Sequence, residues 1–172
     1  MRVLGIDPGT VIAGYGIVDS SGGQIKMVDC GVIKASPKLS PAERLSILYQ
    51  GLSKIVTQYK PDAVAVEQPF VGTNVNSALS IGRAQAVAML IAANNNIPAF
   101  DYTPAQVKQR VASYGASSKE QVQQMVKLQL GLSEVPQPSD AADALAIALC
   151  HLSEVHISHL LDEKPEKKRR TR

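Results

Sequence analysis

The chain has 172 residues, of which 45% are hydrophobic, and this suits one ordinary globular domain with a full core. No segment reads as a signal peptide or a membrane span, so we expect a cytoplasmic protein with no membrane partner. The formal net charge of +3 conceals an asymmetry, because residues 164–172 carry six bases and one acid, which leaves residues 1–163 at −2. We expect a domain over residues 1–161 and a basic, disordered tail over residues 162–172 that either meets a polyanion or is simply solvated.

The predicted elements begin with three strands, at residues 2–6, 14–18 and 25–34. The sequence Ser20-Ser21-Gly22-Gly23 is typical of a turn between the second and the third. The third strand alternates poorly around Asp29-Cys30-Gly31, which predicts a bulge there. Because the three strands are consecutive, they can form an antiparallel meander.

Helices alternate with the later strands. Ser40 and Glu43 form a capping box with Pro41 at the first helical position, which predicts a helix from that point. Short apolar strands at 63–66 and 97–102 are each reached through a helix, as parallel strands require. The sequence therefore predicts an α/β fold: a mixed five-stranded sheet, made of an antiparallel three-stranded meander plus two parallel strands, flanked by helices.

The helix predicted at 77–93 has small residues four apart, at Ala78, Gly82 and Ala86. They allow another element to approach closely, either the sheet of the same chain or a second copy in a dimer. Three further helices are predicted. The first begins at Pro104, and the second follows a capping box of Ser117 and Glu120 and ends near Gly131. The third begins at Ser139 or Asp140 and runs to about His159.

Three histidines and two cysteines carry weak signals. His151, His156 and His159 lie on the last predicted helix without a third metal ligand nearby, so we interpret them as surface or packed residues. Cys30 and Cys150 stand in apolar surroundings, and we expect both to be buried, reduced thiols.

Four acids carry the chemistry. Asp7 follows an apolar strand and precedes Pro8-Gly9, Glu67 follows the strand at 63–66, and Asp140 and Asp143 share one face at the start of a helix. Each alone has an ordinary explanation, such as a turn, a surface acid or a favourable helix dipole. Drawn to a common sheet edge, they would repel one another unless a cation neutralised them. Ligands that are all oxygen suit magnesium or manganese rather than zinc.

The ordered motifs Gly5-Ile6-Asp7-Pro8-Gly9-Thr10, Val66-Glu67-Gln68-Pro69-Phe70 and Asp140-Ala141-Ala142-Asp143-Ala144-Leu145-Ala146 resemble the RuvC family of bacterial Holliday junction resolvases over about residues 1–155. The resemblance implies a ribonuclease H-like fold, a homodimer and magnesium-dependent nicking of four-way DNA junctions in recombination and repair. It maps the catalytic, metal-binding acids onto the four residues named above. Some family members carry histidine at the position of Asp140, so that ligand is the least constrained.

Two Mg²⁺ ions per site, about 3.5–4 Å apart, would account for the expected chemistry, and Mn²⁺ could substitute. Hydrolysis would leave a 5′-phosphate and a 3′-hydroxyl. Asp7 is our choice for the acid that bridges both ions, because it lies at the centre of the predicted sheet edge.

Candidate DNA contacts come from both the residues and the resemblance. Residues 83–127 hold five bases and two acids, a local excess of positive charge in an acidic body. Lys108 and Lys119 match positions where the family places lysines on the DNA backbone, and Arg110 and Lys127 are added as candidates for the same surface. Phe70, three residues after Glu67, is expected to stack on bases near the crossover rather than to fill the core.

Three alternatives remain at this stage: an actin-like nucleotidase, which shares the first motif but needs two subdomains, an RNA-processing nuclease of the same superfold, and a DNA-structure-binding module without catalysis. Four intact acids argue against the last, because a pure binder would gain from losing negative charge near phosphate. The resemblance further implies cooperation with the RuvA–RuvB branch-migration complex.

Overall fold

The computed structural model describes residues 1–69 and 75–162. The strands are β1 (Arg2–Asp7), β2 (Ile12–Ser21), β3 (Gln24–Lys34), β4 (Ala63–Glu67) and β5 (Ala99–Tyr102). The helices are α1 (Pro41–Tyr59), α2 (Val75–Asn94), α3 (Pro104–Ala112), α4 (Lys119–Gln129) and α5 (Ser139–Asp162).

The strands form one five-stranded sheet in the order β3-β2-β1-β4-β5. The first three strands pair antiparallel, whereas β4 pairs parallel with β1 and β5 pairs parallel with β4. This confirms the predicted mixed sheet. The β2–β3 hairpin turns at Gly22 and Gly23, whose φ angles of 58° and 77° favour glycine. The turn is therefore tighter than predicted, since β2 continues through Ser21.

Two local predictions are displaced by one residue. The register shifts so that Ile17 faces Asp29 and Val18 faces Met27, which places the bulge at Val28, just before the predicted position. Similarly, Ser118 rather than Ser117 caps α4, with Gln121 completing the capping box. The sequence offered two possible caps for α4 because two serines are adjacent. Helix α5 extends further than predicted, to Asp162.

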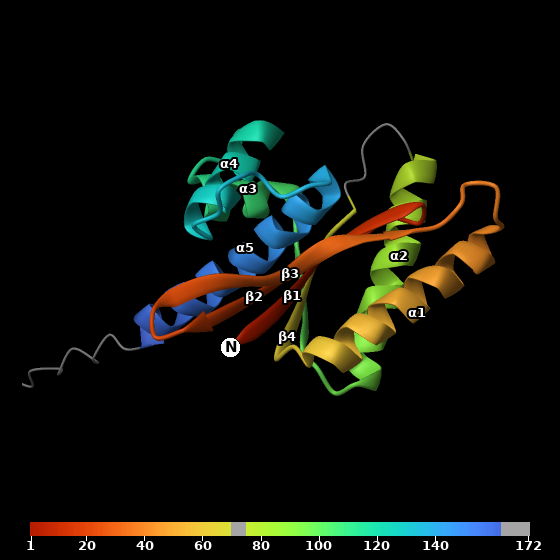
Figure 1. The fold of residues 1–172 in the computed structure, drawn as a ribbon, viewed down its shortest axis with the longest axis horizontal. Coiled ribbons are helices and arrows are strands. Elements are labelled where there is room, and N and C mark those ends of the chain that lie inside the picture. The colour runs from red at the N-terminus through yellow and green to blue at the C-terminus, as the bar shows by residue number, and fades with distance from the viewer. Residues whose placement is uncertain (70–74, 163–172) are drawn as a thin grey trace, which may run out of the picture.

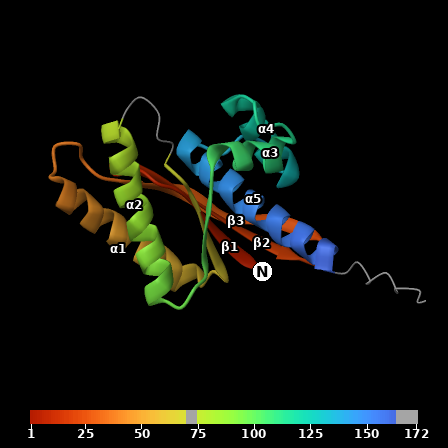
Figure 2. The ribbon, with the colours of Figure 1, turned by 180° about the vertical axis from the view of Figure 1, so that it is seen from behind.

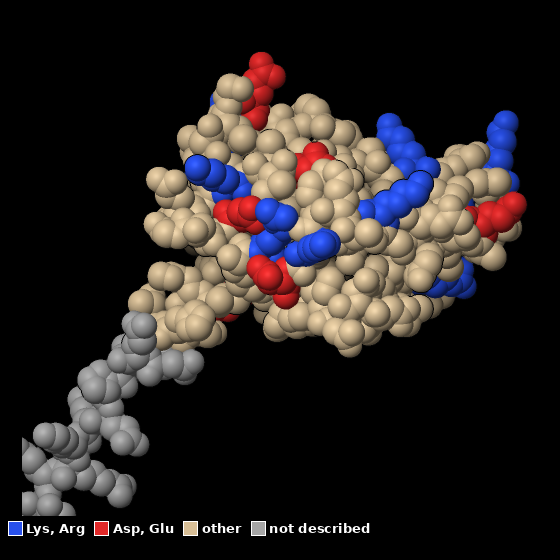
Figure 3. Space-filling model, turned by 60° about the horizontal axis from the view of Figure 1, so that its bottom comes forward, with Lys and Arg blue, Asp and Glu red and all other residues tan. Residues whose placement is uncertain are grey.

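Helices cover both faces of the sheet. Figures 1 and 2 show α1 and α2 on one face and α3, α4 and α5 on the other. Since side chains alternate along a strand, β1 supplies both cores. Leu4 and Ile6 pack with α1 and α2, whereas Val3 packs with α5 and the two shorter helices. Seen from its lower side, the molecule carries acidic and basic side chains next to one another near the middle of the view (Figure 3).

Glycines on the sheet let α5 lie directly against β1 and β2. A Cβ atom at Gly14 would overlap the carbonyl oxygen of Asp140, and one at Gly5 would overlap that of Ala144. Only glycine, which has no side chain, lets the backbone of α5 approach these strands so closely. The close contact fixes the first turn of α5 beside the end of β1.

Helix α2 buries Ala78, the first member of the predicted row of small residues, but its other buried small residues form a different row. Ala84 and Ala88 are in the core, whereas Ala86 is exposed and Gly82 is partly exposed. The sheet-packing interpretation of the row from Ala78 to Ala86 is therefore wrong for its last member. The dimer alternative stays a prediction.

In the described part of the chain, two helices, α2 and α5, are long and apolar enough to cross a membrane by length and composition alone. The expectation that no apolar run reaches this length is wrong on that criterion. The finding is weak evidence for a span, because core helices pass the same test and α5 packs across the sheet. The cysteine prediction holds in part: both thiols are free, but only Cys150 is buried, while Cys30 is partly exposed.

Candidate active site

Two strands bring the first pair of acids to one edge of the sheet. Ile6 in β1 faces Val66 in the parallel strand β4, so Asp7 and Glu67 are the next residues of neighbouring strands. Parallel strands end at the same edge, and open α/β sheets bind ligands there. The predicted meeting of Asp7 and Glu67 follows directly from this register.

The second pair comes from the start of α5. Asp140 and Asp143 lie in its first turns, and the contact between Gly14 and the backbone of Asp140 holds this end of the helix over β2. Since Gly14 faces Asp7 across the β1–β2 ladder, the helix end is set beside Asp7. All four predicted acids are partly buried.

A cavity of about 260 Å³ opens at this place. Within residues 1–69 and 75–162, its polar lining consists of three acids and two lysines: Asp7, Glu67, Asp143, Lys108 and Lys119. Its apolar wall consists of residues from α3, α4 and α5: Pro104, Val107, Val122 and Ala146. Asp140 is not part of the lining, but its charge reaches the site because it contributes to the raised pKa of Asp7.

Asp7 and Glu67, the acids at the strand ends, both have raised pKa values. Burial, followed by the negative charges of Asp143 and Asp140, raises the pKa of Asp7 to about 6. Burial, followed by the charges of Asp7 and Asp143, raises the pKa of Glu67 to about 7. Such shifts mark a site that would gain from a cation.

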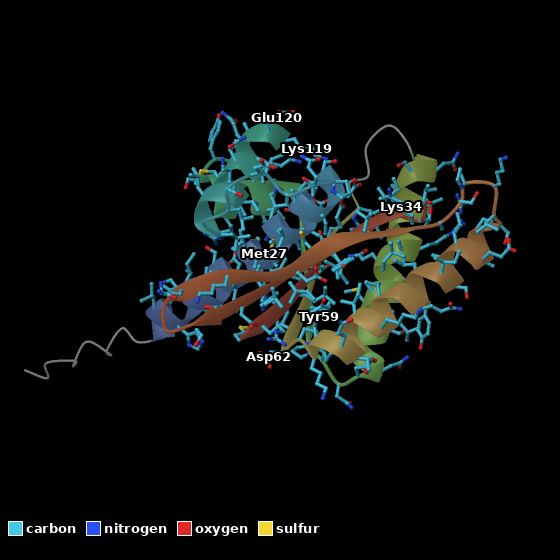
Figure 4. All side chains as sticks on the ribbon, viewed as in Figure 1. Met27, Lys34, Tyr59, Asp62, Lys119 and Glu120 are labelled. Atoms are coloured by element: carbon cyan, nitrogen blue, oxygen red, sulfur yellow. The ribbon has the colours of Figure 1, made fainter. Side chains whose placement is uncertain are left out.

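Lys119 supplies part of that positive charge. Its Nζ lies 2.6 Å from Oδ2 of Asp143, and this hydrogen bond raises the pKa of the ammonium group. Gln123, one turn further along α4, donates from Nε2 to Oδ1 of Asp143 at 3.4 Å. Two residues of α4 thus hold the carboxylate of Asp143. Figure 4 shows Lys119 at the upper end of the molecule.

The donor set fits Mg²⁺ or Mn²⁺ by its chemistry, since three carboxylates line one cavity, Asp140 is close enough to raise the pKa of Asp7, and the pKa of Glu67 is raised as well. In residues 1–69 and 75–162, however, no three His, Cys, Asp or Glu side chains are arranged as a group of metal ligands. Asp143 instead engages Lys119. A metal bound by these acids would therefore replace the ammonium as the partner of Asp143.

The predicted DNA contacts separate into two groups. Lys108 and Lys119 line the cavity with the acids. Arg110 instead forms an ion pair with Glu154, 2.5 Å between Nε and Oε1, and lines another cavity. Lys127 lies in the last turn of α4, outside the lining of the acidic cavity. Phe70 lies outside the described residues, as does the tail from residue 163 onward.

Sequence reasoning missed the partners that hold the site. Gln123 follows Lys119 by four residues, a spacing that places both on one helix face and could have linked them. The bond between Tyr102 Oη and Nδ1 of the buried His151, 2.7 Å, joins β5 to α5. Neither residue belongs to a motif, so only the three-dimensional structure reveals this pair.

Comparisons with known proteins place this site in a family. The family model "Crossover junction endodeoxyribonuclease RuvC" matches residues 3–151. The enzyme of that name from Dehalococcoides mccartyi is 48% identical over 164 residues, which cover 95% of this chain and 98% of the relative. The enzyme from Alkaliphilus oremlandii is 51% identical over 151 residues, which cover 88% of this chain and 92% of the relative.

Among solved structures, the Thermus thermophilus RuvC in complex with a Holliday junction substrate matches with a TM-score of 0.86 and 36% identity. The match covers 92% of this chain and 96% of that one. These similarities decide against the actin-like nucleotidase and the RNA-processing nuclease. The chain belongs to the RuvC family of crossover junction endodeoxyribonucleases, which are metal-dependent nucleases with a ribonuclease H-like fold.

Proposed function

We propose that this chain resolves four-way DNA junctions by paired nicks on opposite strands, with Asp7, Glu67, Asp140 and Asp143 as the metal-binding, catalytic acids. The observation that carries the proposal is the meeting of Asp7, Glu67 and Asp143 with two lysines in one cavity of a RuvC-family chain. Paired nicks require two sites, so the active species is a homodimer.

The proposed roles of the acids and of the two lysines follow from their charges. Two Mg²⁺ ions held by these four acids would supply water activation and stabilisation of the departing 3′ oxygen. Asp7 ends the central strand β1, between β2 and β4, and its pKa is raised by the charges of both Asp143 and Asp140, so it is the acid that we propose would be shared by the two ions. Lys108 and Lys119 offset the repulsion between the acids and the incoming phosphate, because both line the cavity.

The dimer is supported by an apolar surface on α2. Large hydrophobic side chains are exposed along this helix, at Val75, Leu79 and Leu90. Exposed apolar rows of this kind mark interaction sites. Family membership further supports action in the cytoplasm in recombination and repair, with the RuvA–RuvB complex as the proposed partner.

An end-labelled cleavage assay tests the function. A mobile four-way junction and a linear duplex of the same sequence are incubated with the protein and Mg²⁺, with Asp7→Asn as the control. We expect paired nicks on opposite junction strands, with 5′-phosphate ends, from the unaltered protein only. Tight junction binding without nicks would favour the binding module, and near-normal cleavage by Asp7→Asn would remove Asp7 from the metal site.

A further inference from the structure

The turn that follows Asp7 is short and closed. It comprises residues 8–11, between the end of β1 at Asp7 and the start of β2 at Ile12. The ring of Pro8 fixes its φ angle. At the next residue, a Cβ atom on Gly9 would overlap the carbonyl oxygen of Ile12, so the two sides of the turn already touch. The turn therefore moves as one piece, and a shift at any of its residues is passed on to Asp7.

A side chain of this turn is tied to a distant helix. The hydroxyl groups of Thr10 and Ser80 are hydrogen-bonded to each other, with 2.9 Å between Oγ1 and Oγ, although 70 residues separate them in the chain. Both residues are partly buried. Figures 1 and 2 show the turn between β1 and β2 beside the first half of α2, where Ser80 lies. The carboxyl end of β1 is thus linked to α2.

The same part of α2 lies against the residues that follow Glu67. A Cβ atom at Gly82 would come within 3.9 Å of Cγ of Pro69, which is two residues after Glu67. Ser80 and Gly82 belong to one turn of the helix. One helical turn therefore lies beside the chain that continues from each strand-end acid, Asp7 and Glu67.

Helix α2 is itself fixed by the core. Ala84 and Ala88, one and two helical turns after Ser80, are buried in the cluster that also holds Ile6, the residue before Asp7. Protein interiors are close-packed, so the helix cannot shift without disturbing this cluster. Ser80 is thus a firm anchor for the turn that carries Thr10.

Asp7 needs such an anchor because of its neighbours. It shares one cavity with Glu67 and Asp143, and like charges repel one another. We infer that Ser80 is a positioning residue of this site, which acts through Thr10 and the closed turn to hold the carboxylate of Asp7 in place. The hydroxyl pair restrains the strand end without adding charge to it. This inference rests on the proposed function, since it assigns two residues to the support of the same metal site.

Variants that differ by one chemical group test the inference. Thr10→Val keeps the shape of the side chain and removes its hydroxyl, whereas Thr10→Ser keeps the hydroxyl and removes a methyl group. Ser80→Ala removes the other hydroxyl. Ser158→Ala is the matched control, because Ser158 donates a hydrogen bond to the carbonyl of Glu154 at 3.0 Å near the opposite end of α5 from the acids.

Three quantities are measured for each protein. Calorimetry gives the Mn²⁺ affinity of the DNA-free protein, single-turnover cleavage at saturating junction gives the rate, and a fluorescent junction in EDTA gives DNA binding without cleavage. Residues that orient metal ligands commonly change metal affinity or rate by about 10–100-fold when they are replaced.

Thr10→Val and Ser80→Ala should each bind Mn²⁺ about tenfold more weakly and cut about tenfold more slowly, at the lower end of that range. Their affinity for the junction in EDTA should not change. Thr10→Ser and Ser158→Ala should match the unaltered protein. The double variant Thr10→Val/Ser80→Ala should lose no more than either single variant, because both changes remove the same bond.

Unchanged Mn²⁺ affinity and rate in Thr10→Val, or losses that add in the double variant, would overturn the inference. Junction binding in EDTA that fell as far as the rate would also overturn it, because the bond would then support the fold as a whole. In each of these cases the proposed function would stand if the unaltered protein cut junctions. An unaltered protein that neither bound Mn²⁺ nor cut junctions would overturn both.

Discussion

The ammonium of Lys119 lies 2.6 Å from Oδ2 of Asp143, and this ion pair places a positive charge at the acidic cavity. The same ammonium also lowers the pKa values of Asp7 and Glu67 against the larger effect of burial. Lys119 therefore occupies the electrostatic role that a bound metal would take over. Once displaced, it would be free to make the phosphate contact proposed for it.

Replacing Lys119 should separate metal binding from catalysis. Lys119→Gln frees Asp143, so Mn²⁺ should bind the DNA-free protein more tightly, by about fivefold for an ion pair worth about 1 kcal/mol. Cleavage of the junction should nevertheless fall about 10²–10³-fold, because a cation aimed at the reacting phosphate is lost. Calorimetric titration with Mn²⁺ and single-turnover cleavage measure the two effects.

Lys127→Gln is the control for that experiment, because Lys127 is on the same helix but does not line the cavity. Its Mn²⁺ affinity should equal that of the unaltered protein. Unchanged Mn²⁺ affinity in Lys119→Gln would mean that Lys119 does not compete with the metal for Asp143.

The metal-free protein should lose stability as the pH rises. The pKa of Asp7 is raised to about 6 and that of Glu67 to about 7, above the ordinary values of these groups. A carboxyl group with a raised pKa favours the folded state below its unfolded pKa, and this stability is lost as the pH rises through the folded value. We expect the Tm in EDTA to fall by roughly 5–10 °C between pH 5 and pH 8 for a loss of a few kcal/mol.

Thermal melts at pH 5, 6, 7 and 8 measure this fall, and Asp7→Asn/Glu67→Gln should flatten it. Mg²⁺ at pH 8 should restore the Tm of the unaltered protein, since it neutralises the ionised acids. Burial lowers the pKa of His151, which favours the folded state at the upper end of this range and opposes the effect. The difference between the two proteins cancels that contribution, and identical profiles would contradict the prediction.

Much of the fold is predictable because its signals are local. Ser40 and Glu43 form the predicted capping box of α1, and the apolar run before Glu67 forms β4. Asp7 and Glu67 could be paired from sequence because parallel neighbours must end at one edge. The bulge at Val28 and the cap at Ser118 were each missed by one residue, since neighbouring residues offered nearly equivalent choices.

The partners of the predicted site residues could not be found in the same way. Arg110 has the charge of a DNA contact, but its ion pair with Glu154 depends on how α3 packs on α5. Likewise, nothing in the sequence marks Gly14 as the residue beneath Asp140, because Gly14 reads as an ordinary glycine of a strand. Contacts between elements far apart in the chain are fixed by tertiary packing, which local patterns do not encode.

Adding one methyl group at Gly14 should disturb the site through the backbone. The new Cβ would overlap the carbonyl oxygen of Asp140, so Gly14→Ala must push α5 away from β2. We expect a loss of at least about 1–3 kcal/mol in the free energy of unfolding, together with weaker Mn²⁺ binding. Urea titration and calorimetry measure the two quantities.

Gly82→Ala is the matched control, because among the described residues its Cβ would meet only Pro69 Cγ at 3.9 Å and alanine favours the helix. This variant should be at least as stable as the unaltered protein. If Gly14→Ala behaved like Gly82→Ala, the close approach of α5 would not position Asp140.

The hydrogen bond between Tyr102 and His151 should stabilise the fold measurably. The ring of His151 is buried, so Tyr102→Phe leaves Nδ1 without its partner and should cost about 1–3 kcal/mol in the free energy of unfolding. Tyr114→Phe removes the same hydroxyl from a tyrosine that is 67% exposed and should cost almost nothing. Urea unfolding of both variants decides the matter: equal stabilities would show that the bond joining β5 to α5 contributes no more than a hydroxyl in water.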